Sequence, residues 1–181
     1  GGGDGGGGGV SGAGDIPRYE LDESTDFAPA SLEALRRVHD ANYLSSIASM
    51  SSAIAANPTL TSPVPFTPLV QRSHGISFSR LKDPKACDTR ISAGSFDAAR
   101  RAAGAVLHAV DAVLAGRRRN ALCVVRPPGH HAGVKGLIPG SCSCGFCLIN
   151  SVMVGAAHAL FAPPSGTTTT DATTISAAAP P

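Results

Sequence analysis

The stretch from Asn120 to Leu160 constrains the fold most. It begins with an apolar run, Ala121–Val125, that has the length and β-branched character of a strand. Because every position in the run is apolar, it is typical of a strand buried on both faces of a parallel sheet. Arg126-Pro127-Pro128-Gly129 should end this strand, since proline donates no ladder hydrogen bond and glycine permits a sharp turn. The sequence therefore predicts an α/β fold.

Two adjacent histidines, His130 and His131, follow that turn directly. Ligand sites in open α/β sheets lie just beyond the carboxyl ends of the strands. Histidine is also the side chain best suited to gain and lose a proton near neutral pH. We therefore predict that both histidines belong to a catalytic site.

Helices are predicted on both sides of the apolar run. Ser95–Ala115 is expected to be a helix that starts at an N-cap serine, Ser95, and ends before Gly116. A second helix is expected over Leu148–Phe161. The first helix carries an apolar stripe that should pack against the sheet, formed by Phe96, Ala99, Ala103, Val106, Leu107, Val110, Val113 and Leu114.

Ser31–Met50 is predicted to be one helical segment, because Ser31 can cap it and apolar residues recur at helical spacing. His39 lies within it. A lone histidine on such a helix is expected to be structural and satisfied by hydrogen bonds.

Composition divides the chain into three parts. Residues 1–28 are rich in glycine, and residues 162–181 are rich in Ala, Thr and Pro, so both ends are expected to be disordered. Residues 29–161 form the expected folded domain. Five cysteines without a signal peptide favour a reducing compartment. A net charge of +2 and the lack of a long apolar stretch argue against direct binding of nucleic acid or membrane.

Two motifs resemble the zinc-dependent histone deacetylases. Arg126-Pro-Pro-Gly-His-His-Ala132 and Gly145-Phe-Cys-Leu-Ile-Asn-Ser151 are similar to the RPPGHHA and GFCxxNS segments of the class II branch. Gly136-Leu-Ile and the segment Ser143–Cys147 look most like the plant and algal members. The resemblance runs from about Leu32 to Leu160.

This resemblance implies a three-layer α/β/α arginase–deacetylase fold with a parallel sheet, of which residues 29–161 would be an incomplete domain. It implies a hydrolase that removes acetyl groups from lysine side chains of histones or other proteins with zinc-activated water. By the same resemblance, His130 would hydrogen-bond the water and stabilise the oxyanion. His131 would act as general base and then as general acid.

The resemblance also implies three substrate-binding residues. Gly145 would offer its backbone carbonyl to the substrate amide, and Phe146 would form a wall of the tunnel around the lysine stem. Asp88, in an Asp-Thr pair, is a candidate to hold the substrate backbone. An ordinary loop aspartate that makes a local turn is an equal alternative for Asp88.

The expected partners are acetylated-lysine proteins and a co-repressor complex, in the nucleus or the cytoplasm. Zinc is the cofactor of the full-length family, whose ligands are an Asp-x-His pair and a later Asp after the Gly-Phe-Cys helix. Beyond Leu160 this sequence has one acid, Asp171, and no histidine. We therefore expect no catalytic zinc ligand in this chain, and an inactive fragment when the chain is alone.

Three alternatives stay open. Cys142, Cys144 and Cys147 could hold a structural zinc ion together with one of the tandem histidines. Cys144 and Cys147 could instead form a redox pair at a helix start. The chain could also be a non-catalytic pseudoenzyme, or a truncated protein that binds the partners of a full deacetylase.

Overall fold

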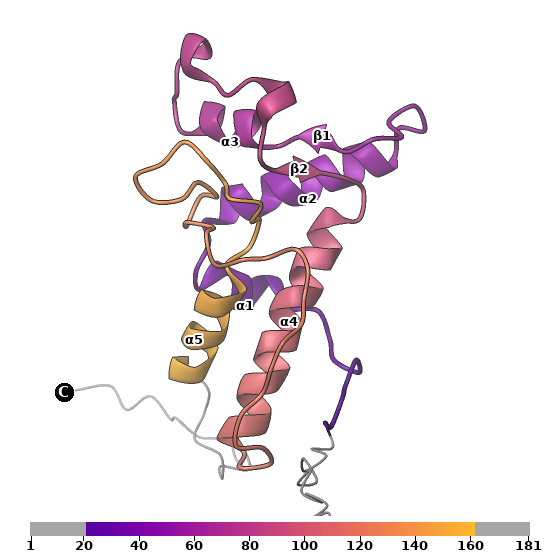
Figure 1. Cartoon of the computed structure of the whole chain (residues 1–181), viewed down its shortest axis with the longest axis vertical. Coiled ribbons are helices and arrows are strands. Elements are labelled where there is room, and N and C mark those ends of the chain that lie inside the picture. Colours follow the sequence, from indigo (N-terminus) through magenta and orange to yellow (C-terminus); the bar gives the residue numbers. More distant parts are fainter. Residues whose placement is uncertain (1–20, 162–181) are drawn as a thin grey trace, which may run out of the picture.

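The computed structural model describes residues 21–161, and this part of the chain is mainly helical (Figure 1). Its α-helices are α1 (Leu32–Arg36), α2 (Ala41–Ala55), α3 (Thr67–Ser73), α4 (Ser95–Leu114) and α5 (Ser151–Phe161). Two short 3₁₀ helices, η1 (Phe78–Arg80) and η2 (Pro84–Ala86), lie between α3 and α4. Two short strands, β1 (Val64–Pro65) and β2 (Arg90–Ile91), pair antiparallel in the register Val64↔Ile91 and Pro65↔Arg90. None of these helices is long and apolar enough to cross a membrane.

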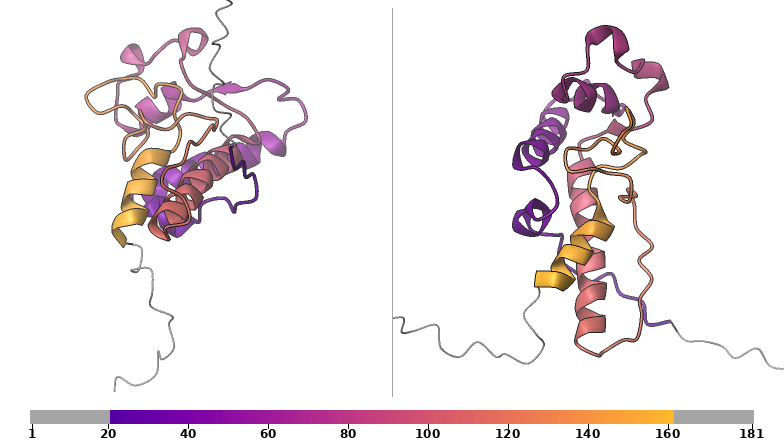
Figure 2. Two further views of the ribbon diagram at one scale, coloured as in Figure 1. Left: turned by 60° about the horizontal axis from the view of Figure 1, so that its bottom comes forward. Right: turned by 90° about the vertical axis from the view of Figure 1, so that its left-hand side faces the viewer.

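Helix α4 forms the long axis of the described part, with α5 beside its C-terminal half (Figures 1 and 2). The two helices approach closely at Gly155, where a Cβ atom would lie 2.5 Å from a methyl carbon of Val106. His158 and Asp111 join the same helices through an Nε2–Oδ1 contact of 2.7 Å. Helix α2 crosses the other end of α4, where the Ser51 hydroxyl accepts a hydrogen bond from the backbone N–H of Phe96 (3.3 Å).

The prediction of a long helix from Ser95 is confirmed, but its details needed the structure. Gly94 is the N-cap, and the hydroxyl of Ser95 instead accepts a bond from the Ser92 N–H (2.8 Å). The apolar stripe was predicted to pack on a sheet, and this was wrong. Its N-terminal residues, such as Ala99 and Ala103, are buried among helices, because no extended sheet lies in the described part.

The predicted single helix over Ser31–Met50 is two helices. Ser31 does cap α1, since its hydroxyl accepts a bond from the Ala34 N–H (3.1 Å). The chain then leaves the helix and restarts at Asp40, whose carboxylate accepts from the Tyr43 N–H (3.0 Å). A short acidic side chain that can bond to the backbone competes with helix continuation, and this explains the break.

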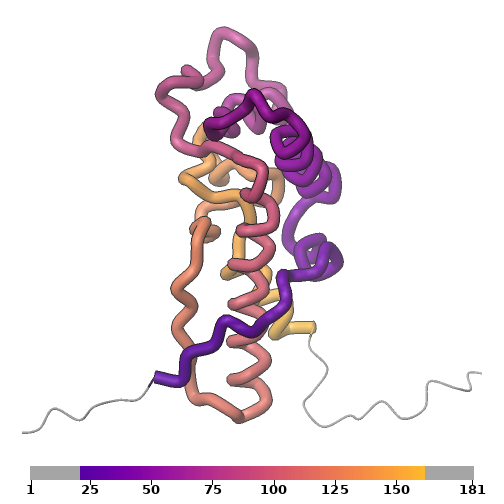
Figure 3. Tube along the Cα trace, turned by 90° about the vertical axis from the view of Figure 1, so that its right-hand side faces the viewer, coloured from indigo at the N-terminus to yellow at the C-terminus, as the bar shows by residue number. Residues whose placement is uncertain are grey.

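The prediction of a buried strand at Ala121–Val125 was wrong. The segment is extended and runs beside α4 (Figure 3), but it pairs with no strand among residues 21–161. Leu122 and Val124 are therefore 88% and 89% exposed, while the Cys123 thiol faces the Ala105 carbonyl oxygen at 3.7 Å. An extended segment becomes a sheet strand only when a neighbour supplies backbone donors and acceptors, and the described residues supply none here.

The predicted helix over Leu148–Phe161 begins later, at Ser151. Leu148 and Ile149 are buried in the irregular segment before it. They join a core in which Leu35, Ile47, Phe66, Ile91 and Val154 are among the most deeply buried side chains. The terminal segments predicted to be disordered are residues 1–28 and 162–181, and of these residues 1–20 and 162–181 lie outside the described part.

Candidate active site

The two histidines lie in a tight turn that packs against the start of α5. The rings of His130 and His131 are 4.2 Å apart between centroids, at an interplanar angle of 51°, and both residues are exposed. Gly129, just before them, is buried against backbone. A Cβ atom at Gly129 would lie 2.3 Å from the Ile149 carbonyl oxygen and 2.7 Å from the Ser151 nitrogen. Glycine is therefore needed for the histidine turn to lie this close to α5.

The side chain of Asn150 also joins the histidine turn to α5. Its amide nitrogen donates to the carbonyl oxygens of Ala132 (3.0 Å) and His130 (3.5 Å). Its amide oxygen accepts from the Met153 N–H (3.1 Å), which satisfies one of the unpaired donors at the helix start. One side chain therefore fixes the position of the histidine turn relative to the helix.

His39 supports the same region from α2's side, and its predicted structural role is confirmed. Its Nε2 atom accepts from the Asn150 N–H (2.9 Å), and its Nδ1 atom lies 3.2 Å from the Val134 carbonyl oxygen. Because Nε2 accepts, the proton of the neutral ring is on Nδ1, which donates to Val134. The ring is 3% exposed. Burial lowers the pKa of His39, and its hydrogen bonds to backbone carbonyls only partly oppose that effect.

The lowered pKa of His39 predicts a loss of stability in mild acid. A group with a lowered folded-state pKa contributes full stability above its unfolded value, here 6.5, and loses it as the pH falls below that value. We expect the unfolding free energy to drop by up to about 1.4 kcal/mol per pH unit below this point. His39→Gln keeps a donor and an acceptor but does not titrate. Urea unfolding at pH 7 and pH 5 should give the variant a flatter pH profile, and equal profiles would contradict the prediction.

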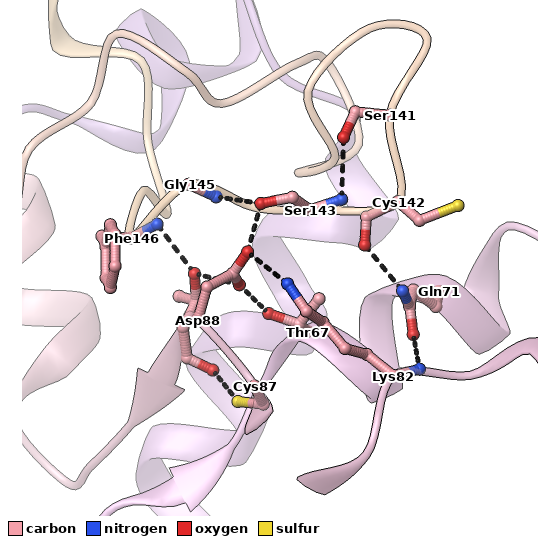
Figure 4. Close-up of polar contacts among 11 residues, drawn as sticks. Thr67, Gln71, Lys82, Cys87, Asp88, Ser141, Cys142, Ser143, Gly145 and Phe146 are labelled. Carbon is pink, nitrogen blue, oxygen red and sulfur yellow. Dashed lines mark hydrogen bonds and ion pairs between the residues drawn. The ribbon is translucent and has the colours of Figure 1, made fainter. Parts of the chain in front are cut away.

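Asp88 is the centre of a polar cluster between α3, the segment before α4, and the loop before Gly145 (Figure 4). Its Oδ1 atom accepts from the hydroxyls of Thr67 (2.5 Å) and Thr89 (3.1 Å). Its Oδ2 atom accepts from the Lys82 ammonium (3.2 Å) and from the Ser143 hydroxyl. Burial alone would raise the pKa of Asp88, but these four hydrogen bonds outweigh it and hold the pKa well below its usual range.

Gly145 and Phe146 lie between this cluster and the histidines. Both have left-handed backbone, with φ of 58° and 64°. Gly145 packs on the ring of His131, since a Cβ atom there would be 2.8 Å from His131 Cδ2. The ring of Phe146 faces solvent at 62% exposure. The carbonyl oxygen of Gly145 accepts from the Cys147 thiol (3.2 Å), which leaves one lone pair free.

The structure therefore brings four of the five predicted site residues together. His130, His131, Gly145 and Phe146 form one surface, while Asp88 lies behind it and reaches it through Ser143 and Thr89. Sequence analysis did not identify the two hydroxyl residues or Asn150. Asn150, Thr89 and Ser143 all stand inside segments already quoted, but nothing in those segments marks their hydrogen-bonding roles.

The buried thiols next to this surface are poor candidates for redox chemistry or metal binding. Burial raises the pKa of Cys144 to about 12, and it also raises the pKa of Cys147. Both shifts oppose formation of the reactive thiolate. Within residues 21–161 no three His, Cys, Asp or Glu side chains are grouped so that they could hold a metal ion. The donor set of the described part therefore does not fit a zinc site.

Comparison with known proteins gives a family match over most of the chain. The model of the histone deacetylase domain matches residues 13–164. Type-2 histone deacetylase 1 of Dictyostelium discoideum is 50% identical over 72 residues, which are 40% of this chain and 5% of that protein. Human polyamine deacetylase HDAC10 is 49% identical over 65 residues, which are 36% of this chain and 9% of that protein. A histone deacetylase-like amidohydrolase of Pseudomonas aeruginosa is 34% identical over 126 residues, which are 70% of this chain and 24% of that protein.

Among solved structures, the HDA15 HD domain is similar, with a TM-score of 0.53 and 24% sequence identity over 75% of this chain and 30% of that chain. The chain thus spans less than a third of the length of each of these proteins. The family match and this structural similarity confirm the predicted fold class, the arginase–deacetylase α/β fold.

Proposed function

The chain belongs to the histone deacetylase family, and from that premise we propose that it forms part of a hydrolase that removes acetyl groups from lysine side chains. The observation that supports the proposal most is the surface on which His131 packs against Gly145, with His130 and Phe146 beside them. It combines proton-transfer groups with an exposed aromatic ring and a free carbonyl lone pair. An amide hydrolase acting on a long methylene side chain can use the histidines for proton transfer, the ring for apolar contact and the carbonyl to accept a hydrogen bond.

The histidines would perform the proton transfers of the hydrolysis. His131 takes a proton from the water that attacks the acetyl carbon, and later gives a proton to the lysine amine as the C–N bond breaks. His130 donates a hydrogen bond to the oxyanion that forms on the carbonyl oxygen. The products are acetate and the free lysine amine.

Phe146 and Gly145 would hold the substrate. The exposed face of the Phe146 ring offers apolar contact to the lysine methylenes. The free lone pair of the Gly145 carbonyl can accept a hydrogen bond from the substrate amide N–H. Binding at two points along the lysine side chain would bring its acetyl group to the histidines.

Zinc is the cofactor that the family implies, and the described residues do not provide its ligands. We propose that the metal ligands of the domain come from residues beyond those described. The natural partners proposed are acetylated-lysine proteins and a co-repressor complex, in the nucleus or the cytoplasm.

The 181-residue chain alone is expected to show no useful deacetylation. Its tandem histidines can move protons, but a catalytic zinc is held by three protein ligands, which the described residues lack. The test is acetate release from an acetyl-lysine peptide with added zinc, comparing this chain with one extended to the complete domain. Activity in the extended chain, with none in the 181-residue chain, would support the proposal. Robust turnover by the short chain that a chelator abolishes would contradict the expectation for the short chain, and an inactive extended chain would contradict the proposed function.

A further inference from the structure

The carboxylate of Asp88 has no acceptor capacity left for a substrate. An ionised carboxylate has about four acceptor sites on its two oxygens. Thr67 and Thr89 occupy Oδ1, and Lys82 and Ser143 occupy Oδ2 (Figure 4). A direct bond from Asp88 to a substrate backbone would have to displace one of these donors. The side chain is also only 14% exposed.

Two of these four donors connect Asp88 to the candidate active site by hydrogen bonds. The Ser143 hydroxyl donates to Asp88 and accepts from the Gly145 N–H (3.0 Å). The Thr89 hydroxyl also donates to Asp88, and it accepts from the Phe146 N–H (2.9 Å). A hydroxyl has a single proton, so donation toward the carboxylate turns its lone pairs toward the amides. The carboxylate thereby orients two acceptors, one for each neighbouring amide.

The backbone of Phe146, which follows Gly145, needs such support. A left-handed conformation is easy for glycine but uncommon for phenylalanine, whose Cβ atom crowds the backbone. Such a conformation persists only where the surrounding structure determines it. Here a side-chain hydroxyl accepts from the backbone N–H of each residue, and both hydroxyls donate to Asp88.

We propose that Asp88 is a positioning residue, which holds Gly145 and Phe146 in place through the hydroxyls of Ser143 and Thr89 and does not itself bind the substrate. Lys82 and Thr67 also donate to the carboxylate, and these two bonds help to fix its position relative to the Ser143 and Thr89 hydroxyls. The inference rests on the proposed function insofar as Gly145 and Phe146 contact the substrate.

Amide hydrogen exchange in the 181-residue chain tests these hydrogen bonds without any need for turnover. Thr89→Val has nearly the same shape as threonine but cannot accept a hydrogen bond. We expect it to speed exchange of the Phe146 amide about tenfold, the effect of losing one hydrogen bond. Exchange of the Ala103 amide, in the buried part of α4, should stay unchanged. Thr89→Ser keeps the hydroxyl and should restore slow exchange at Phe146.

Ser143 and Asp88 provide two further variants. Ser143→Ala should speed exchange of the Gly145 amide and spare Phe146. Asp88→Asn should speed both amides together while Ala103 stays protected. If Asp88→Asn does not fold, the comparison of Thr89→Val with Thr89→Ser decides alone.

Two results would overturn the positioning role. One is unchanged exchange at Phe146 in Thr89→Val. The other is a rise at Ala103 as large as the rise at Gly145 and Phe146, because that would mean general destabilisation. Either result leaves the deacetylase proposal intact, since that proposal is tested by acetate release from the extended chain.

Discussion

Replacement of His131 by alanine should lower the deacetylation rate by about a hundredfold or more, the usual scale for general acid–base catalysis. The expectation concerns a chain extended to the complete domain. His131 packs on Gly145 at the surface where the substrate amide is proposed to bind, which is where the attacking water would have to lie. Alanine at this position can neither take that proton nor protonate the departing amine. The measurement is kcat on an acetyl-lysine peptide.

A second histidine provides the matched control. His108 is exposed on α4 and faces Phe27, with ring centroids 6.0 Å apart. His108→Ala removes the same ring at a distance from the candidate active site, and it should leave kcat near that of the parent chain. A His131→Ala enzyme as active as the His108→Ala enzyme would refute the assignment of His131 as general base.

Gly129→Ala should cause a large loss of stability in the described part. The added methyl group would lie 2.3 Å from the Ile149 carbonyl oxygen and 2.7 Å from the Ser151 nitrogen. These are backbone atoms at the start of α5, so no side-chain rotation can relieve the overlap. The histidine turn must move away from the helix. We expect the unfolding free energy to fall by about 2 kcal/mol or more, measured by urea unfolding with far-UV circular dichroism.

Gly94→Ala is the control for this substitution. Gly94 also has a negative φ, and a Cβ atom there would meet nothing within 4 Å. Because Gly94 is the N-cap of α4, alanine there should cost well under the Gly129 effect. Equal losses for the two variants would show that loss of glycine alone, and not the backbone overlap, explains the result.

The histidine turn could be predicted because its determinants are local in the sequence. Two prolines and a glycine stop the extended run before His130 and His131, and each acts through its own backbone geometry. The body of α4 was predictable for the same reason, since helical hydrogen bonds join residues four apart. The cap residue was not. Serine is a favoured cap residue, but the Ser95 hydroxyl instead accepts from the backbone N–H of Ser92, three residues earlier.

The environment of Asp88 could not be predicted from any local pattern. Its partners Thr67 and Ser143 are 21 and 55 residues away in the sequence. Only the folding of α3 and the loop before Gly145 onto the same place brings their hydroxyls to the carboxylate. The motif marked Asp88 as a candidate substrate contact, whereas the hydrogen bonds that fill its acceptor sites became visible only in the structure.

The sequence by itself determined where the tandem histidines follow the extended run and where the main helices lie. The tertiary structure alone decided which backbone groups found partners. Ala121–Val125 has the composition of a buried strand, yet it stays unpaired among the described residues, with Leu122 and Val124 exposed. The physical reason is that extended conformation is a local preference of β-branched residues, whereas strand burial requires a second backbone at hydrogen-bonding distance.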